Sequence, residues 1–469
     1  MAFEILKKDI VGKVHFIGIG GIGMSALALL LNKVGIGVQG SDINQTYVTE
    51  KLQKNNIEVF FAQEGGNITK DVGLVVKTSI IRDNNPEVIA AEESGIKIIT
   101  RAELLAHIMH EKTPITAAGT HGKTSTTALI SAIFIAADLE PTVINGGFIN
   151  SLKSNFILGD GEYLIAESDE SDGSFVDLPS YAGVVTNIEP EHLDFYGNDF
   201  NLQKSYFEKY ISQIPKEGVC AVNAQDQNIQ KICSKIEEKN IVTYSIDNNV
   251  DADFMAQNIK FSNQGTSFDV SFQGQDFAKN IFLPAFGAHN VSNSLAAIAV
   301  AHHCKISAQQ VKSGLAQYQG VKRRFTKVGE YNGCVIIDDY AHHPTEIKAA
   351  VSCAKQYADQ GQVALVIQPH KYSRVRDLFD EFCESVTGTD KVFLLDIYSA
   401  NQGKIAGISK ELLFKQMSKI HPDVVMLNND NDLAKEVKDF AKKDNIILCV
   451  GAGTVTKYAS NLEKELQLL

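Results

Sequence analysis

Short apolar runs alternate with helix-compatible segments along almost the whole chain, and this alternation is the feature that most constrains the fold. The first runs are rich in β-branched residues and occur at 14–17, 36–38, 74–76 and 97–99. Strands separated by helices are typical of parallel sheets, because a helix returns the chain to the same end of the sheet for the next strand. We therefore predict an α/β protein built on parallel sheets.

The alternation restarts twice further along the chain. A charged, proline-containing break at 111–114 precedes predicted strands near residue 115, at 164–166 and at 184–186. From 254 to 283 the apolar residues follow a period of two around turns at 263–265 and 273–274, which predicts antiparallel hairpins, followed by a helix over 292–304. A third series begins after Gly320, with apolar runs at 334–337, 363–367, 392–395, 424–427 and 446–450.

Charge and cysteine content narrow the class of protein. The net charge of −12 argues against a general nucleic-acid or anionic-membrane binder. The seven cysteines are scattered without a CxxC pair, which argues against a disulfide framework or a structural zinc site and favours a reducing compartment. The first residues lack the apolar run of a signal peptide, and the most apolar stretch, 128–137, is too short to cross a bilayer. We expect a cytoplasmic protein without membrane insertion.

A glycine-rich turn, GIGGIG at 18–23, lies between the strand 14–17 and a helix-like segment at 24–34. Glycines at such a turn let backbone N–H groups approach a diphosphate at the positive end of the helix. Asp42 follows the next predicted strand, where a carboxylate that contacts a ribose usually lies. The motif predicts a nucleotide-type ligand, and by itself it leaves NAD and other nucleotide diphosphates open.

A second glycine motif, AAGTHGKT at 117–124, again lies between an apolar run and a helix. Backbone N–H groups of such a loop wrap around phosphates, while Lys123 neutralises their charge and the Thr124 hydroxyl holds Mg²⁺. The general P-loop pattern has glycine at position 117, where this chain has alanine. The motif predicts ATP binding in addition to the first nucleotide, and an ordinary dehydrogenase has no use for that combination.

Acidic side chains follow the next two strands at the same predicted edge. The segment ESDESD at 167–172 follows the run 163–166, and carboxylates that project toward a phosphate loop are suitable Mg²⁺ ligands. The segment NIEPEHLD at 187–194 follows the strand 184–186. Its combination of asparagine, carboxylates and histidine predicts a second cation position or a proton-transfer group.

Basic side chains concentrate in the last third of the chain. Residues 321–376 hold nine lysines or arginines and five acidic residues, although the whole chain is acidic. This stretch includes Arg323 and Arg324, a histidine pair at 342–343 and the run QPHKYSRVR at 368–376. Arginines beside histidine pairs at strand ends are suited to clamp phosphate and carboxylate groups.

The length of 469 residues agrees with three domains, because domains average about 150 residues. We predict a Rossmann-like N-terminal domain over 1–110, which binds the first nucleotide. A central P-loop ATPase domain of α/β type with antiparallel hairpins follows over 111–322. A Rossmann-like α/β domain over 323–469 completes the chain.

These motifs together resemble the Mur ligase family. The sequences GTHGKT, ESDESD, TNIEPEHLD, GAHN, RRF and DDYAHHPTE occur in this order across nearly the whole chain. The resemblance implies that the three domains bind a UDP-sugar, ATP and an amino acid in turn, with the glycine turn of 18–23 on the diphosphate. It thereby favours a UDP-sugar over NAD as the first ligand.

The resemblance also implies a set of residues for each ligand. The expected catalytic residues are Lys123, Glu167 and His192. Thr124 and Glu167 are expected to hold one Mg²⁺, and Glu167 with His192 a second. ATP is expected at Gly119, Thr120, His121, Gly122, Lys123, Thr124, Ser125, His289, Asn290, Arg324, Asp339 and Tyr340. The UDP-sugar is expected at Gly18, Gly20, Gly21, Gly23, Ser41 and Asp42, and the amino acid at His342, Lys371 and Arg374.

Two positions depart from the family's pattern. Lys371 lies where this branch of the family usually has arginine, and a lysine offers no bidentate contact to a carboxylate. Several sister ligases carry a metal-bridging modified lysine some fourteen residues after the counterpart of His192. This chain has Tyr206 there, so we expect no such modification.

The implied activity is ATP-dependent ligation in peptidoglycan precursor synthesis. The carboxylate of UDP-N-acetylmuramate takes the γ-phosphoryl group of ATP, and the amine of L-alanine attacks the resulting acyl phosphate. A recycling ligase that attaches a tripeptide to the same sugar nucleotide is the first alternative, although the compact segment 172–179 resembles the alanine branch more closely. An NAD-dependent oxidoreductase and a non-catalytic nucleotide-binding regulator are the others. Selectivity among alanine, serine and glycine, and the choice between monomer and homodimer, stay open.

Overall fold

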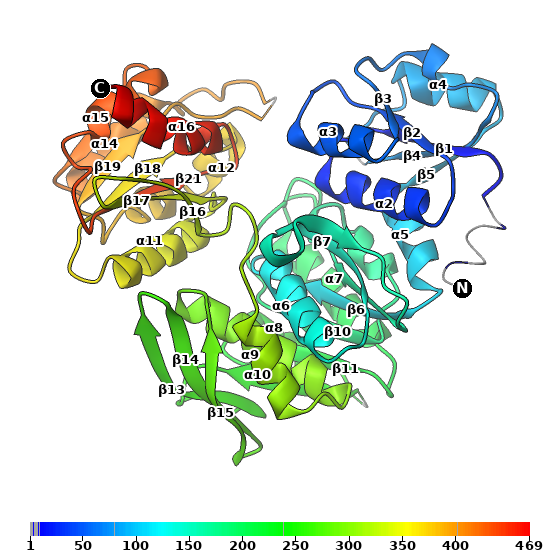
Figure 1. Ribbon diagram of the computed structural model, residues 1–469, viewed down its shortest axis with the longest axis horizontal. Helices are drawn as coiled ribbons and strands as arrows, with labels where there is room; N and C mark the ends of the chain where they lie inside the picture. The colour runs from blue at the N-terminus through cyan, green and yellow to red at the C-terminus, as the bar shows by residue number, and fades with distance from the viewer. Residues whose placement is uncertain (1–2, 4–7, 9, 79, 238, 401) are drawn as a thin grey trace. The chain divides into compact units, whose positions relative to one another are not determined.

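The computed structural model describes residues 3, 8, 10–78, 80–237, 239–400 and 402–469. The chain forms three sheets one after another (Figure 1). It divides into two compact units, the first of which comprises the chain up to residue 258 together with 268–282 and 291–319. The second unit comprises 259–267, 283–290 and 320–469. The three-domain α/β fold class is confirmed, while the boundaries near 110 and 322 stay predictions.

The first sheet has five parallel strands in the order β3-β2-β1-β4-β5. Its elements are β1 (Lys13–Ile17), α2 (Ile22–Lys33), β2 (Val38–Ser41), α3 (Tyr47–Lys54), β3 (Glu58–Phe60), the short 3₁₀ helix η1 (Gly65–Asn67), β4 (Val72–Lys77), α4 (Pro86–Glu93), β5 (Lys97–Thr100) and α5 (Arg101–Met109). The strand order reverses beside β1, and ligands of such sheets bind outside the strand ends at this reversal. The glycine turn of 18–23 follows β1, so it lies at that position.

Two strands of this sheet differ from the prediction. The predicted strand at 36–38 was placed too early, because β2 runs from Val38 to Ser41 and Ile36 packs into the core from the turn after α2. β3 was missed because it has three residues, of which only Val59 is buried.

The central sheet has ten strands in the order β15-β14-β13-β12-β11-β10-β6-β9-β7-β8. Its elements are β6 (Thr113–Ala118), α6 (Lys123–Ala136), β7 (Thr142–Ile149), β8 (Ser154–Ile157), β9 (Tyr163–Glu167), β10 (Ala182–Val185), α7 (Phe200–Gln213), β11 (Val219–Asn223), α8 (Gln227–Cys233), β12 (Ile241–Ser245), β13 (Phe254–Ser262), β14 (Gly265–Phe272), β15 (Gln275–Leu283), α9 (Ala288–His303) and α10 (Ala308–Ala316). Two-residue turns join β13 to β14 and β14 to β15, and turns this short connect antiparallel strands, as predicted. The helix predicted at 292–304 begins four residues earlier, at Ala288.

The third sheet has six strands in the order β16-β17-β21-β18-β19-β20. Its elements are β16 (Thr326–Tyr331), β17 (Cys334–Asp339), α11 (Pro344–Ala358), β18 (Val363–Ile367), α12 (Tyr372–Asp377), α13 (Phe379–Glu384), β19 (Lys391–Leu394), α14 (Lys410–Ile420), β20 (Val424–Met426), α15 (Leu433–Val437), β21 (Ile446–Val450) and α16 (Val455–Leu468). All five predicted strands are present. The sequence did not reveal β16, a largely polar edge strand that pairs antiparallel with β17.

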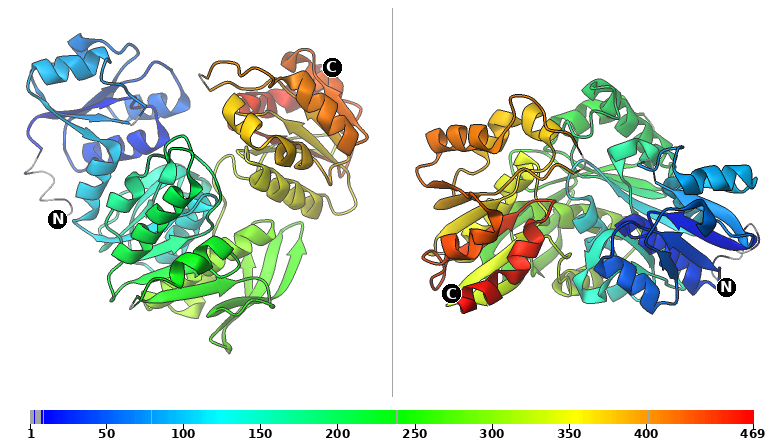
Figure 2. Two further views of the ribbon diagram at one scale, coloured as in Figure 1. Left: turned by 180° about the vertical axis from the view of Figure 1, so that it is seen from behind. Right: turned by 90° about the horizontal axis from the view of Figure 1, so that it is seen from above.

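Both faces of the third sheet are buried, which explains its unbroken apolar strands. In β21, Ile446, Leu448 and Val450 belong to the core on the side of α11, α13 and α14. The residues between them, Ile447 and Cys449, belong to the core on the side of α15 and α16. Side chains alternate across a strand, so a strand covered on both faces needs apolar residues at every position. Figure 2 shows helices on both faces of this sheet.

Helix α2 connects the first two sheets within the first unit. Its buried residues share one core with Ile144 of β7 and Phe156 of β8. At its first turn, Asn155 Nδ2 donates a hydrogen bond of 2.8 Å to the carbonyl of Ile22. The helix that follows the glycine turn is therefore fixed to the central sheet as well as to its own sheet.

The described residues include no helix that combines the length and apolar character needed to span a bilayer.

Replacing Leu448 by alanine tests the two-sided core of the third sheet. Leu448 is fully buried in the central strand β21, so the Leu448→Ala variant should lose about 2–5 kcal/mol of the free energy of unfolding. Leu468→Ala is the control, because Leu468 is 78% exposed near the end of α16 and should change stability by less than about 0.5 kcal/mol. Urea denaturation of both variants measures the difference, and equal stability would contradict the assigned core.

Candidate active site at the strand ends

Three polar loops follow three adjacent parallel strands of the central sheet. β6 lies between β10 and β9, and it pairs in parallel with both. The glycine loop of 119–122 follows β6, the acidic loop of 167–172 ends β9, and the segment 186–194 follows β10. Because parallel strands end at the same edge of a sheet, all three predicted motifs lie together, as the sequence indicated.

The glycine loop between β6 and α6 is a tight connection to a helix N-terminus. Ala117 is buried within β6, so the alanine that departs from the general pattern is a strand residue and leaves the loop itself unchanged. Gly122 has a φ of +83°, a conformation that favours glycine, directly before Lys123 begins α6. The first intrahelical bond runs from Thr126 N to Gly122 O, so the N–H groups of residues 123–125 lie outside the helical pattern and face the loop's end.

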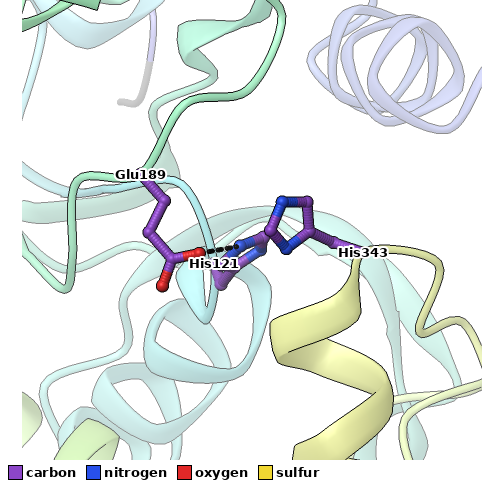
Figure 3. A group of neighbouring side chains, drawn as sticks. All are labelled: His121, Glu189 and His343. Atoms are coloured by element: carbon purple, nitrogen blue, oxygen red, sulfur yellow. Dashed lines mark ion pairs between the residues drawn. The ribbon is translucent and has the colours of Figure 1, made fainter. Parts of the chain in front are cut away.

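The loop after β10 is hydrogen-bonded to this glycine loop. Asn187 Oδ1 accepts from the N–H of His121 at 2.9 Å, and Asn187 Nδ2 donates to the carbonyl of His121 at 3.0 Å. Thr120 Oγ1 accepts from the N–H of Glu189 at 2.9 Å. His121 Nε2 also lies 3.5 Å from Glu189 Oε2, the ion pair drawn as a dashed line in Figure 3. The two motifs therefore form one rigid structural unit.

Lys123 lies among carboxylates at the start of α6. Its Nζ is 2.5 Å from Glu170 Oε2 and donates to the carbonyls of Gly119 at 2.8 Å and Thr120 at 3.0 Å. Burial lowers the pKa of Lys123, but the charges of Glu170, Asp169 and Glu167 outweigh it and raise that pKa above its usual value. Burial raises the pKa of Glu170 to about 7, although Lys123 lowers it. Lys123 is therefore protonated, and a carboxylate and two backbone carbonyls surround its ammonium group.

Thr124 and Glu167 place two oxygens where one cation can bind both. Thr124 Oγ1 donates to Glu167 Oε2 at 2.8 Å, and the same oxygen accepts from the N–H of Gly146 in β7 at 3.0 Å. Two oxygens held by one Mg²⁺ at about 2.1 Å lie roughly 3 Å apart along an edge of the octahedron. The spacing and the hard oxygen donors therefore fit Mg²⁺.

His192 fits a magnesium site less well than these two residues. It has a φ of +54°, and its Nε2 lies 4.0 Å from Glu191 Oε1. Imidazole nitrogen is a softer donor than the oxygens Mg²⁺ prefers. In the acidic loop, Asp169 and Asp172 accept from the N–H groups two residues ahead and shape the turns, whereas Glu167 and Glu170 contact Thr124 and Lys123 directly.

Hydrogen bonds from the end of β2 hold the glycine turn of the first sheet in place. The carbonyl of Ser41 accepts from the N–H groups of Gly18 at 2.8 Å and Ile19 at 2.9 Å. Asp42 Oδ2 accepts from the N–H of Gly20 at 2.9 Å, so this carboxylate holds the turn as well as lying beside it. Ser41 is fully buried, and its hydroxyl donates to Glu87 at 2.6 Å. Its side chain is thus committed to the protein interior rather than aimed at a ligand.

Arg101 is a residue near both loops that the sequence analysis missed. A Cβ placed on Gly23 would lie 3.2 Å from Cδ of Arg101, so the glycine leaves room for this side chain beside α2. The other end of Arg101 reaches toward the acidic loop, with Nη2 3.8 Å from Asp169 Oδ2. The available signal was its position, because Arg101 directly follows β5 at the carboxyl end of the sheet.

In the second unit, a second group of predicted residues surrounds the end of β17. Both oxygens of Asp339 accept backbone N–H groups, from Phe325 and from Ala341, each at 2.7 Å. Burial raises the pKa of Asp339 to about 6, against the lowering effect of Arg324. The Arg324 guanidinium lies 5.5 Å from the ring centroid of Tyr340. Asp339 therefore fixes the backbone directly beside Arg324 and Tyr340.

The residues expected for the amino acid lie together in the same unit. The rings of His342 and His370 are 5.7 Å apart, and Arg374 Nη1 donates to the carbonyl of His370 at 3.1 Å. Lys371 has a φ of +67°, and its N–H donates to the carbonyl of Tyr398.

Two further residues expected for ATP, His289 and Asn290, lie in the first turn of α9. Asn290 Nδ2 donates to the carbonyl of Phe286 at 2.8 Å.

Glu346 joins the two sets of residues in the second unit and was not predicted. Its Oε1 lies 3.5 Å from Arg324 Nη1, and its Oε2 accepts from the N–H of His342 at 3.1 Å. The sequence contained a usable signal, because His343 at the N-cap, Pro344 and Glu346 at the third helical position form a capping box at the start of α11.

The family of the chain follows from comparison with known proteins. Residues 13–113 match the Mur ligase family, catalytic domain; residues 117–301 match the Mur ligase middle domain; and residues 323–453 match the Mur ligase, glutamate ligase domain. The chain belongs to the Mur ligase family.

Individual relatives match over nearly the full length. The chain is 40% identical over 465 residues to the UDP-N-acetylmuramate–L-alanine ligase of Rhodospirillum centenum, covering 98% of this chain and 95% of that protein. It is 42% identical over 472 residues to the enzyme of the same name from Rickettsia prowazekii, with coverage of 98% and 95%. The crystal structure of the UDP-N-acetylmuramate-alanine ligase MurC of Thermotoga maritima superposes with a TM-score of 0.84 at 26% identity, covering 97% of this chain and 99% of that one.

The buried pair of Lys123 and Glu170 gives a test that is independent of activity. Glu170 is 1% exposed, so the Lys123→Met variant leaves a buried carboxylate without its counterion and should lose about 3–5 kcal/mol of the free energy of unfolding. Adding Glu170→Gln should restore most of that loss. The exposed pair of Lys209 and Asp177, at 3.6 Å, is the control, and Lys209→Met should cost less than about 1 kcal/mol. Equal effects in urea denaturation would contradict the assigned pair.

Proposed function

We propose that the chain is an ATP-dependent ligase that joins L-alanine to the carboxylate of UDP-N-acetylmuramate in peptidoglycan precursor synthesis. The observation that carries this proposal is the grouping of Lys123 and Thr124, at the start of α6, with Glu167 at the end of β9. The names of the relatives, at 40% and 42% identity over nearly the full length, support the choice of substrates.

The phosphate loop supplies what phosphoryl transfer needs. A carboxylate resists attack by an amine, so it first takes the γ-phosphoryl group of ATP, which gives an acyl phosphate and ADP. Lys123 exchanges the carbonyls of Gly119 and Thr120 for phosphate oxygens, and the N–H groups of residues 123–125 donate to the same anion. Because Lys123 is held protonated, it neutralises charge throughout the transfer.

Mg²⁺ is part of the proposal: Thr124 and Glu167 are the residues that fit one ion, and Glu167 with His192 would hold a second. When bound, it neutralises charge on the phosphate oxygens. Thr124 and Glu167 hold their oxygens 2.8 Å apart beforehand, so little rearrangement is needed to bind a cation.

The amine of L-alanine then attacks the acyl phosphate, and phosphate leaves. His342, Lys371 and Arg374 are the proposed contacts for the amino acid, and Arg324, Asp339 and Tyr340 are proposed on the ATP side. Arg374 already donates to the carbonyl of His370 and lies 3.1 Å from its Nδ1. A guanidinium can bind a carboxylate through two N–H groups in one plane, which a lysine at position 371 cannot do.

Replacing Lys123 tests the proposed role of the phosphate loop. Lys123→Ala removes the cation that neutralises the transferring phosphoryl group, so kcat should fall by about 100-fold or more. The measurement is phosphate release that depends on both UDP-N-acetylmuramate and L-alanine, with amide product counted in parallel. Lys209→Ala, in an exposed lysine of the same unit, should keep full activity. Undiminished amide formation by Lys123→Ala would refute the assignment.

The choice of amino substrate separates the proposal from its nearest alternative. The enzyme should release phosphate with UDP-N-acetylmuramate and free L-alanine at a kcat/KM at least about tenfold above that with the tripeptide, because a site built around a free amino acid gains nothing from extra residues. The reverse order would identify a recycling ligase. Tight ATP binding without phosphate release on adding both substrates would instead identify a regulator, and binding of NADH would favour an oxidoreductase.

A further inference from the structure

A buried carboxylate lies beneath the glycine turn of the first sheet, outside every motif described above. Glu87, in the first turn of α4, is fully buried, and so are His15 of β1 and Gln39 of β2. A carboxylate in the interior is costly unless polar partners satisfy it. The hydrogen-bond partners of the Glu87 carboxylate therefore identify the elements that it holds in place.

Two hydrogen bonds converge on Glu87 from different elements. Ser41, the last residue of β2, donates from its hydroxyl to Oε2 at 2.6 Å. Asn67, at the end of η1, donates from Nδ2 to Oε1 at 2.7 Å, and the same amide nitrogen donates to the carbonyl of Ala62. Both carboxylate oxygens are thus occupied by donors, and Glu87 links β2, η1 and α4.

His15 completes this network from the central strand β1. Gln39 Nε2 donates to the carbonyl of Asn67 at 2.8 Å and lies 3.2 Å from His15 Nδ1. An amide nitrogen carries only donors, so Gln39 presents a donor to His15 Nδ1. The other ring nitrogen, His15 Nε2, lies 3.2 Å from Glu87 Oε1, although without the alignment of a hydrogen bond.

The network reaches the glycine turn through the backbone of a single residue. The hydroxyl of Ser41 is held by Glu87, and its carbonyl accepts from the N–H groups of Gly18 and Ile19. The next residue, Asp42, holds the N–H of Gly20 through its carboxylate. The position of the turn therefore depends on where β2 ends, and Glu87 fixes that end.

The chemistry of this network indicates a role beyond stability. The neighbouring core of the same sheet, around Val72, Val75 and Val88, is apolar, and an apolar side chain in place of Glu87 would avoid the cost of burying a carboxylate. A polar network resists displacement in direction as well as distance, because each hydrogen bond constrains an angle. Such rigidity is valuable where donors must meet a ligand within a fraction of an ångström.

We infer that Glu87 is a positioning residue for the UDP-sugar diphosphate: through Ser41 it holds the turn, whose N–H groups at 18–21 bond within the protein, and thereby positions the N–H groups of residues 22–24 at the start of α2 toward the ligand. This inference rests on the proposed function for its ligand. Removing Glu87 frees Ser41, lets the turn move and weakens binding of the diphosphate, while the phosphate loop after β6 keeps its own hydrogen bonds.

The test compares Glu87→Ala with Glu87→Gln, using the full chain. Glu87→Ala should raise the KM for UDP-N-acetylmuramate by roughly 10–100-fold, while the KM for ATP stays within about twofold of the wild type. Glu87→Gln should recover most of this loss, because its carbonyl oxygen can accept from Asn67 and its amide can donate to the Ser41 hydroxyl. Glu92→Ala, at an exposed position of the same helix, is the control and should match the wild type.

Two further measurements keep the test decisive. If Glu87→Ala fails to fold, Ser41→Ala removes only the link to the turn and should still raise the KM for UDP-N-acetylmuramate severalfold. Calorimetric binding of UDP to each variant should weaken in parallel. An unchanged KM for the sugar nucleotide in a folded Glu87→Ala variant, or an equal rise in both KM values, would overturn the inference. Absence of sugar-dependent phosphate release in the wild type would instead overturn the proposed function.

Discussion

The parallel pairing of β10, β6 and β9 is the constraint on which the rest of the candidate site depends. A strand covered on both faces is mostly apolar along its length, with exceptions such as Thr116 of β6 that are hydrogen-bonded inside, so charged residues gather where the strand ends. Parallel pairing brings three such ends to one edge, and there Asn187 binds the backbone of His121 while Glu167 binds Thr124. Residues about 70 positions apart in sequence, such as Thr120 and Glu189, thereby become neighbours because the strands that precede them are paired.

Paired charges explain how an acidic chain can be suited to anionic ligands. Lys123 lies against Glu170, Arg101 near Asp169, and Arg324 near Glu346. The carboxylate beside each cation offsets its positive charge before a ligand binds, and the cation keeps the N–H donors that a phosphate or carboxylate needs. The net charge of −12 excludes a general polyanion binder, but it is an average that says nothing about these local pairs.

The sequence was sufficient to predict the alternating fold and the loops that carry chemistry, because both follow from local patterns. The alternation of strands with helices and the motif at 117–124 needed only periodicity and turn chemistry. It was not sufficient for β3 and β16, whose short or polar strands carry no such period, and it also missed the strands β7, β8, β11 and β12 of the central sheet. Nor did it reveal Arg101, which becomes relevant only because Gly23 and Asp169 approach it in space. Ser41 was selected for its position, and only the structure shows that its side chain faces Glu87.

The glycines of these loops illustrate why motif and topology cannot be separated. A Cβ on Gly119 would lie 2.0 Å from Thr186 Oγ1, and one on Gly146 would lie 2.1 Å from Glu167 Oε2. Both positions are closed by a side chain from a neighbouring strand end, so any larger residue would push that neighbour away. Glycine at 119 is therefore favoured by its φ of +133° and by the close approach of Thr186, and glycine at 146 in β7 leaves the space that the Glu167 carboxylate occupies. The glycine at 119 in the phosphate-loop motif therefore also reflects the adjacent strand β10, because the loop takes its conformation with Thr186 packed directly against it.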